Sequence, residues 1–284
     1  MNWEKAKNTL IVFFIIIDAC LFGILMRTNA GNTRVSRAAV QQTVKLLHQH
    51  QITVKESVIP RKKFKNRNYN LTALLFKNNK RTEKWIGSGY QTLQEDAAAH
   101  RYVYQNKNKQ LVINKTGIDF SVSKNAVLLS EKSQKDMESY LVSKLKRMGF
   151  SNQNYYYSSV WYENGLYCAR ISPKAENIKL VGIELYVAAD KDEIIKISGN
   201  WFQYSGKESF AENNLLEVTA VLANLIYIPG QEGSEITEIS LAAYVSSEYL
   251  NNKVITAGPV YIFAKSDGTQ YYFDARTGEL IMQK

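Results

Sequence analysis

Residues 9–26 form an almost unbroken apolar run, TLIVFFIIIDACLFGILM, with a single acidic residue, Asp18, at its centre. As an α-helix, a run of this length reaches about 27 Å, which is close to the roughly 30 Å hydrocarbon core of a bilayer. The chain that follows is polar and globular in character. The pattern predicts a transmembrane anchor, which we place at residues 9–27, followed by one large domain on the far side of the membrane.

A cleaved signal peptide is the alternative interpretation of this run. Residues 28–30, Thr-Asn-Ala, fit a small-x-small cleavage site. The run is, however, longer than the usual h-region of about 7–15 residues, and Arg27 interrupts the approach to the site. We therefore favour a retained anchor. Positive charges flank the run on both sides, so the expected orientation depends on length: a short head, residues 1–8, stays in the cytoplasm more easily than a long body.

Asp18 occupies a costly position. A carboxylate at the centre of a transmembrane helix costs about 2.5–3.5 kcal/mol on insertion scales, and a partner helix usually offsets this cost with a hydrogen bond or an opposite charge. We predict that Asp18 contacts a partner helix inside the membrane, with Phe14 and Phe22 as further contacts. A protonated acid that the span tolerates without a partner is the alternative.

The positions of the two cysteines and the net charge indicate what kind of domain follows the apolar run. Cys20 lies in the apolar run and Cys168 far away in the globular part, so no disulfide framework is expected. A body of about 250 residues can bury enough core without one. The net charge of +10 resides in the body, because two lysines and two acids cancel before residue 27.

The basic residues are densest between residues 61 and 67. Beyond a membrane, lipid headgroups and wall polymers are the available polyanions, and nucleic acid is not expected there. The candidate polyanion contacts are Arg61, Lys62, Lys63, Lys65 and Arg67. The alternative is a solvated loop that happens to be basic.

Hydrophobic periodicity predicts an α+β body. Apolar spacings of three and four indicate helices over 34–50, from Ser133 to a stop at Gly149, and over 213–227. Residues 61–100 are the least regular. Strands are predicted over 52–59, 101–105, 110–114, 118–122, 155–161, 166–172, 180–188, 194–204, 236–246, 254–264, 270–273 and 279–282. A helix followed by antiparallel strands occurs twice, which predicts an N-terminal α+β domain over 28–125 and a tandem α+β domain over 126–284.

The sequence contains no recognisable catalytic or cofactor-binding motif. His48 and His50 are two residues apart and point to different faces of a helix, so they do not jointly hold a metal. Asp190, Asp192 and Glu193 crowd acids at a predicted hairpin, without the spacing and glycine of a calcium loop. We expect a protein that is not an enzyme and needs no cofactor or metal.

The C-terminal segment 271–281, YYFDARTGELI, is predicted to form a closing hairpin. Aromatic residues make a strand, Asp274 opens a turn, and Gly278 supplies a positive φ before a short return strand. This segment resembles the closing hairpin of PepSY-type domains, in which a tyrosine-rich strand runs into D-A-x-T-G-E. The resemblance implies a small extracytoplasmic α+β module of an inhibitory or regulatory kind.

The chain as a whole resembles the YycI family. The resemblance rests on the opening MNWEKAK running directly into a single membrane helix, and extends through the body to the D-A-R-T-G-E close at 274–279. It implies a membrane-anchored accessory regulator that binds a cell-wall sensor histidine kinase together with a YycH-like protein, in Gram-positive bacteria. Two other functions stay open: an extracytoplasmic inhibitor of a wall protease or hydrolase, and a wall-polymer-binding module that uses residues 61–67.

Overall fold

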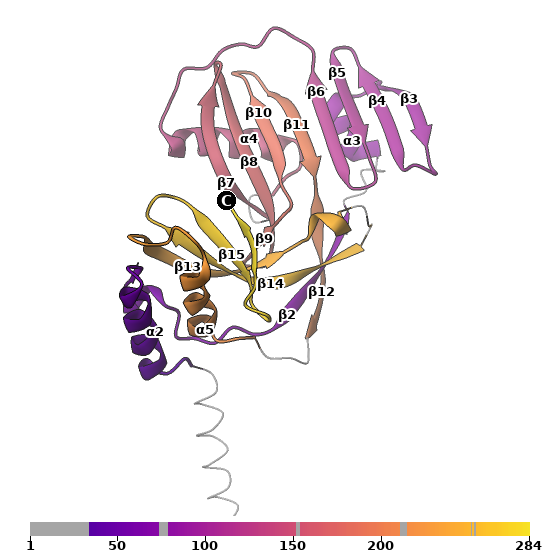
Figure 1. The fold of residues 1–284 in the computed structure, drawn as a ribbon. Helices are drawn as coiled ribbons and strands as arrows, with labels where there is room; N and C mark the ends of the chain where they lie inside the picture. Colours follow the sequence, from indigo (N-terminus) through magenta and orange to yellow (C-terminus); the bar gives the residue numbers. More distant parts are fainter. Residues whose placement is uncertain (1–33, 74–78, 152–153, 211–214, 251, 253) are drawn as a thin grey trace, which may run out of the picture. The chain divides into compact units, whose positions relative to one another are not determined.

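The computed structural model describes residues 34–284 apart from 74–78, 152–153, 211–214, 251 and 253 (Figure 1). The predicted anchor, with Phe14, Asp18 and Phe22, lies outside these residues. Within the described chain, no helix is both long and apolar enough to span a bilayer. The described chain is a sheet-rich α+β fold with few helices, as the sequence predicts for the body.

The chain divides into two compact units that are not continuous in sequence. Unit 1 takes residues up to 65, 215–240 and 261–284, and unit 2 takes 66–214 and 241–260. Unit 2 therefore includes residues on both sides of the division that we placed between 125 and 126. The reason is strand pairing, because the strand over 117–122 lies beside the strand over 194–200.

Unit 1 combines elements from both ends of the described chain. Helix α2 (Arg37–Gln49) confirms the predicted helix: the Ser36 side chain caps it, and Val40 and Leu47 are buried. It packs against α5 (Val218–Ala223), which continues as the 3₁₀ turn η2 (Asn224–Tyr227). The other elements are β1 (Thr53–Val54), η1 (Glu56–Val58), the first part of β13 (Glu235–Tyr244), the last part of β14 (Val254–Lys265), β15 (Gln270–Asp274) and β16 (Leu280–Gln283).

The closing hairpin of unit 1 has the predicted chemistry. Asp274 Oδ1 accepts the backbone N–H groups of Arg276 at 2.6 Å and Thr277 at 3.0 Å, and Gly278 has φ +76°. The Asn224 side-chain amide donates to the Gly278 carbonyl oxygen at 2.8 Å. This hydrogen bond ties the turn to the end of α5.

Unit 2 contains an antiparallel sheet in the order β7-β8-β10-β11-β6-β5-β4-β3 (Figure 1). The predicted meander over 101–122 is confirmed as its last part. The strands are β3 (Gln91–Asp96), β4 (Arg101–Asn106), β5 (Lys109–Ile113), β6 (Gly117–Val122), β7 (Tyr155–Glu163), β8 (Leu166–Ala175), β10 (Leu185–Ala189) and β11 (Ile194–Asn200).

Two helices cover one face of this sheet. Helix α4 (Gln134–Arg147) begins at the predicted cap Ser133 and buries Met137, Leu141 and Leu145. Helix α3 (Asn79–Ile86) lies in the segment that we expected to be least regular, and it buries Trp85 and Ile86 in the same core as the α4 residues.

A second group of strands completes unit 2. Strand β2 (Arg67–Ala73) lies between β12 (Phe202–Phe210) and β14, and all three are antiparallel. The predicted strand over 180–188 is two strands, β9 (Ile178–Val181) and β10, separated at Gly182 with φ +90°. The predicted strand over 194–204 is likewise two, β11 and β12, with Trp201 at the junction. The expectation of purely antiparallel pairing is wrong for β13, which runs parallel to β1 and to β9.

Candidate functional site

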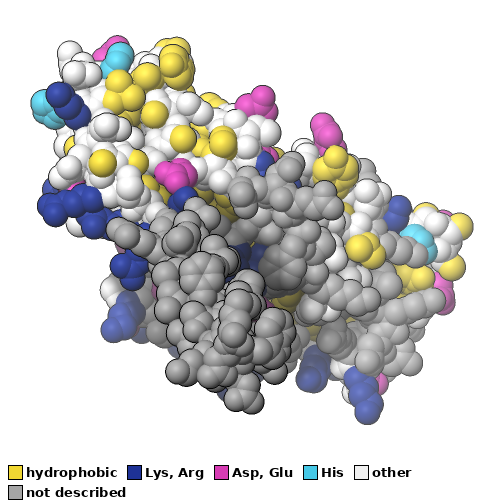
Figure 2. Space-filling model, turned by 90° about the horizontal axis from the view of Figure 1, so that it is seen from below, with side chains coloured by type: hydrophobic (Ala, Val, Ile, Leu, Met, Phe, Trp, Pro, Cys, Tyr) yellow, Lys and Arg dark blue, Asp and Glu magenta, His cyan; other side chains and the backbone are white. Residues whose placement is uncertain are grey.

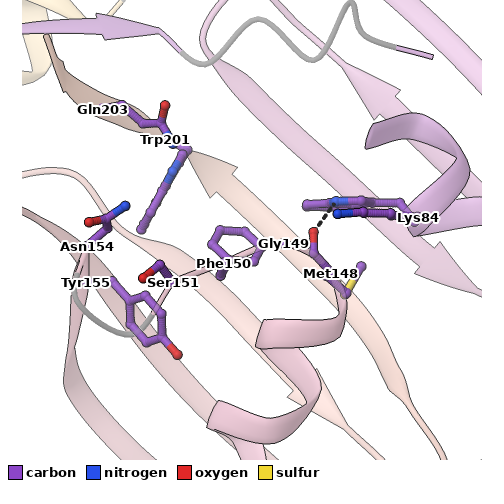
Figure 3. A pocket seen from close by; sticks show the side chains of 10 residues that line it. Lys84, Met148, Gly149, Phe150, Ser151, Asn154, Tyr155, Trp201 and Gln203 are labelled. Atoms are coloured by element: carbon purple, nitrogen blue, oxygen red, sulfur yellow. Dashed lines mark hydrogen bonds between the residues drawn. The ribbon is translucent and has the colours of Figure 1, made fainter. Parts of the chain in front are cut away.

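A cavity of about 190 Å³ opens at the C-terminal end of α4, within unit 2 (Figure 3). We call it the aromatic pocket. Its walls carry the rings of Trp85, Phe150, Tyr155 and Trp201, all of which are buried. Its remaining lining residues are Lys84, Met148, Gly149, Ser151, Asn154 and Gln203.

The end of α4 directs Phe150 into this pocket. Gly149 adopts φ +92°, and the Phe150 N–H then donates back to the Leu145 carbonyl oxygen at 3.1 Å. This is the geometry with which a glycine commonly ends a helix. The reversal turns the chain toward the core, so Phe150 becomes the central ring of the site.

The aromatic rings hold one another in place. The centroid of the Phe150 ring lies 5.7 Å from that of Trp85, 5.4 Å from that of Trp201 and 6.4 Å from that of Tyr155. Trp85 also donates from Nε1 to the Met148 carbonyl oxygen at 3.0 Å, the dashed line in Figure 3. Centroid distances of 4.5–7 Å are those of favourable ring contacts, so the walls of the pocket are formed before any ligand arrives.

Two further cavities adjoin the aromatic pocket through shared residues. One, of about 650 Å³, shares Asn154, Trp201 and Gln203 with it and extends along Pro173 and Lys174. The other, of about 160 Å³, shares Lys84, Trp85 and Met148 and extends to Lys109, Phe120, Lys144, Arg147, Asp192, Glu193 and Ile194. Figure 3 shows Lys84 and Met148 on one side of Phe150, and Asn154, Trp201 and Gln203 on the other. We call the three cavities together the groove.

Cations dominate the α3 and α4 side of the groove. Within the described chain, Lys84 and Arg147 have no acidic side chain at ion-pair distance. The ammonium of Lys144 donates to the backbone carbonyl oxygens of Lys191, at 3.3 Å, and Asp192. Burial and the nearby Arg147 lower the pKa of Lys144. The acids of this side are compensated, because Glu193 lies 2.5 Å from Lys109 Nζ and 3.2 Å from Lys124 Nζ.

A buried carboxylate fixes the hairpin beside the groove. Asp190 is fully buried and accepts the N–H groups of Val127 at 3.2 Å and of Asp192 and Glu193 at 2.9 Å. Lys124 Nζ lies 3.0 Å from its Oδ2. Burial alone would raise the pKa of Asp190, but these N–H groups and the Lys124 ammonium together hold it below its usual value.

This arrangement confirms the turn interpretation of Asp190, Asp192 and Glu193. The Tyr140 hydroxyl on α4 donates to the backbone carbonyl oxygens of Asp190 at 2.6 Å and Lys191 at 2.8 Å, so the cluster also anchors the helix. Over the described residues, no group of three or more His, Cys, Asp or Glu side chains could hold a metal ion. Its hydrogen bonds to Val127 and Tyr140 make the cluster a structural support of the hairpin beside the groove.

The predicted polyanion contacts are divided between the two compact units of the chain. Arg61, Lys62, Lys63 and Lys65 belong to unit 1, and Arg67 begins β2 in unit 2. Lys63 Nζ lies 2.7 Å from Glu217 Oε1, and an Arg61 guanidinium nitrogen lies 3.9 Å from Glu56 Oε2. On the face drawn in Figure 2, Lys and Arg side chains occur at several separate places, with acidic side chains between some of them. Polyanion binding by these residues stays a prediction.

Sequence reasoning did not identify the aromatic pocket. Trp85, Phe150 and Trp201 come from an expected irregular segment, a helix end and a strand junction, and no motif joins them. Tyr155, in a segment predicted as a strand, is also a buried wall of the pocket. The available signal was local: a tryptophan or phenylalanine beside a helix-ending glycine, at Trp85-Ile86-Gly87 and Gly149-Phe150.

No family model matches the chain, and no curated protein matches it. Among solved structures, the chain is similar to the Bacillus megaterium YpeB C-terminal domain, with a TM-score of 0.45 and 10% sequence identity. The alignment covers 72% of this chain and 94% of that chain. At this TM-score the likeness identifies neither a family nor a function.

Proposed function

We propose that this protein is a membrane-anchored, non-enzymatic regulator of a cell-wall sensor histidine kinase. It binds the kinase together with a YycH-like protein, through a single transmembrane helix and an extracytoplasmic body. The observation that carries the proposal is the apolar run 9–26 with Asp18 at its centre. A carboxylate in that position is costly without a partner, and in an anchor whose only task is attachment it would have no use.

The body supports the same function with a site suited to contact. Its groove has aromatic walls already in place and cations without acidic partners among the described residues. Buried aromatic and arginine-bearing sites are those that most often contribute binding energy at protein interfaces. A partner that engages both the helix and the body gains affinity from two linked contacts.

Regulation would act as a bias between two states of the kinase. A bound helix shifts that equilibrium only by the difference between its affinities for the two states, which is typically about 1–3 kcal/mol. Asp18 is suited to such a difference, since a hydrogen bond inside a membrane forms in one helix arrangement and is lost in another.

The test is a mild-detergent pull-down of the full-length protein from its own membranes, with mass spectrometry of the proteins recovered. We expect a sensor histidine kinase and a second single-pass protein. Asp18→Leu should reduce recovery of the kinase, whereas Asp18→Asn, which still hydrogen-bonds, should retain most of it. The control is Cys20→Leu, which changes a neighbouring residue of the same run without touching the acid.

Two other results would contradict the proposal. Recovery of a wall protease or hydrolase in place of a kinase would favour the inhibitor function. Binding of anionic wall polymer that falls steeply with salt and is abolished by charge reversal at residues 61–67 would favour the polymer-binding function.

A further inference from the structure

We propose that the groove of unit 2 binds an acidic peptide segment that inserts one aromatic side chain into the aromatic pocket. The segment belongs to the extracytoplasmic part of a partner protein, so this inference rests on the function proposed above. It assigns the body's contact surface, which that function leaves open.

The aromatic pocket is large enough for one inserted side chain and smaller than the usual site for a whole small molecule. Sites for whole small molecules usually enclose about 300–1,000 Å³, whereas the aromatic pocket encloses about 190 Å³. Its walls offer ring faces and edges from Trp85, Phe150 and Trp201, which suit a further ring in an edge-to-face or offset arrangement. An inserted tryptophan, tyrosine or phenylalanine therefore fits the pocket.

The adjoining cavities provide room for the chain on either side of that ring. They share lining residues with opposite sides of the pocket, Lys84 and Met148 on one side and Asn154 and Gln203 on the other (Figure 3). Successive side chains of an extended chain point to opposite faces, so the neighbours of an inserted ring are directed away from the pocket, toward the residues that the adjoining cavities share with it. The exposed polar side chains of Ser151, Asn154 and Gln203 line the aromatic pocket and can hydrogen-bond the backbone of such a segment.

The positively charged side chains that line the groove favour a segment with acidic residues. On the side of α3 and α4, Lys84 and Arg147 lack acidic partners among the described residues. The Lys144 ammonium is already engaged by backbone oxygens, by the Tyr140 ring at 4.9 Å and by the nearby acids of the 190–193 hairpin, so it is not one of the cations available to the segment. The acids on that side, Asp192 and Glu193, already lie near Lys124. On the side of Pro173, Lys174 and Glu176 balance each other in charge. The groove therefore favours acidic residues next to the inserted ring on the α3 and α4 side.

The experiment uses the full-length protein in detergent and a fluorescein-labelled pentapeptide, Asp-Glu-Trp-Glu-Asp, read by fluorescence anisotropy. Two comparison peptides replace the tryptophan by alanine or the acids by lysine. We expect saturable binding of the acidic tryptophan peptide that weakens as salt rises, and at least tenfold weaker binding of both comparison peptides.

Variants locate the binding in the groove. Ser151 is exposed and lines the aromatic pocket. Ser151→Trp should therefore fill the pocket and abolish binding without removing a core side chain. Lys84→Glu and Arg147→Glu should each weaken it about fivefold. Lys146→Glu is the matched control, because this residue is exposed on the same helix and does not line the groove. Circular dichroism checks that each variant is folded.

Several results would overturn the inference: equal binding of the three peptides, full binding by folded Ser151→Trp, or an effect of Lys146→Glu as large as that of Lys84→Glu. Self-association of the full chain that Ser151→Trp abolishes would assign the groove to a second copy instead. The pull-down separates this inference from the proposed function, because loss of the kinase in Asp18→Leu with no effect of Ser151→Trp rejects the groove alone.

Discussion

The indole Nε1 of Trp85, at the end of α3, donates a hydrogen bond to the carbonyl oxygen of Met148, at the end of α4, over 3.0 Å. The two residues are 63 positions apart in the chain. This hydrogen bond satisfies a carbonyl that the helix end leaves without an intrahelical partner, and it fixes one wall of the aromatic pocket. The last turns of both helices therefore hold each other at the site.

Replacing the Trp85 indole by a phenyl ring removes this hydrogen bond and part of the buried ring, so it should lower the stability of the protein. We expect Trp85→Phe to lower the free energy of unfolding by at least about 0.5–1.5 kcal/mol, the net value of a hydrogen bond, with a further loss from the smaller ring. Urea denaturation measures the change. Trp161→Phe is the control, because the Trp161 indole donates to the exposed Glu163 at 3.0 Å. An equal effect of the two substitutions would contradict the role given to Trp85.

The buried carboxylate of Asp190 should be a large single contributor to the stability of unit 2. Asp190→Ala leaves three backbone N–H groups without their acceptor and removes the nearest of the acids around Lys124, so we expect a loss of about 3 kcal/mol. Asp192→Ala is the matched control from the same turn, since its side chain is 59% exposed. It should cost less than about 1 kcal/mol. Denaturant titration of both variants measures the difference.

The same carboxylate predicts a dependence of stability on pH. Because the folded protein holds the pKa of Asp190 below its usual value, a proton binds the unfolded state more readily than the folded state. Its contribution is therefore complete above the unfolded pKa of about 3.9 and is lost as pH falls through the lower folded value.

Urea midpoints measured from neutral to acidic pH test this dependence. The wild type should lose more stability below about pH 4 than Asp190→Asn, which lacks the titrating group. Parallel curves for the two proteins would show that Asp190 does not contribute in this way.

The closing hairpin of unit 1 should be sensitive at Gly278. A Cβ there would lie 2.9 Å from Asn224 Nδ2 and 3.2 Å from Leu216 Cδ1, and the backbone has φ +76°. Gly268 has φ +88° with no atom within 4 Å of such a Cβ. We expect Gly268→Ala to cost about 1–2 kcal/mol from backbone strain alone, and Gly278→Ala to cost clearly more. Thermal unfolding compares them, and equal losses would show that the close contacts with Asn224 and Leu216 add nothing.

Local sequence signals predict the elements whose contacts are close in the chain. Helix α4 has its predicted cap at Ser133, buried residues at spacings of four, and the predicted glycine stop. The turn at Asn164 and Gly165 has positive φ at both residues, the conformation for which an Asn-Gly pair is preferred in hairpins. Asp274 and Gly278 make the expected turn for the same reason.

Other features depend on partners distant in sequence. Helix α3 has Trp85 and Ile86 as its buried apolar residues among charged and polar ones, so it lacks the apolar stripe that marks a helix. The break between β11 and β12 at Trp201 follows from the different strands that each pairs with, β6 and β2, and no single segment carries that information. The pocket was missed because it forms only where these long-range contacts meet.

Under the function that we propose, the protein biases the activity of a sensor kinase in the same membrane. The most direct measurement is the autophosphorylation rate of the co-purified kinase in proteoliposomes, with the wild-type protein, with Asp18→Leu and without either. A coupling free energy of about 1–3 kcal/mol shifts the equilibrium between the two kinase states by about 5- to 150-fold. We predict that the wild-type protein changes the autophosphorylation rate through this shift, and that Asp18→Leu removes most of the change. An unchanged rate when the wild-type protein is present in the same bilayer would contradict the account.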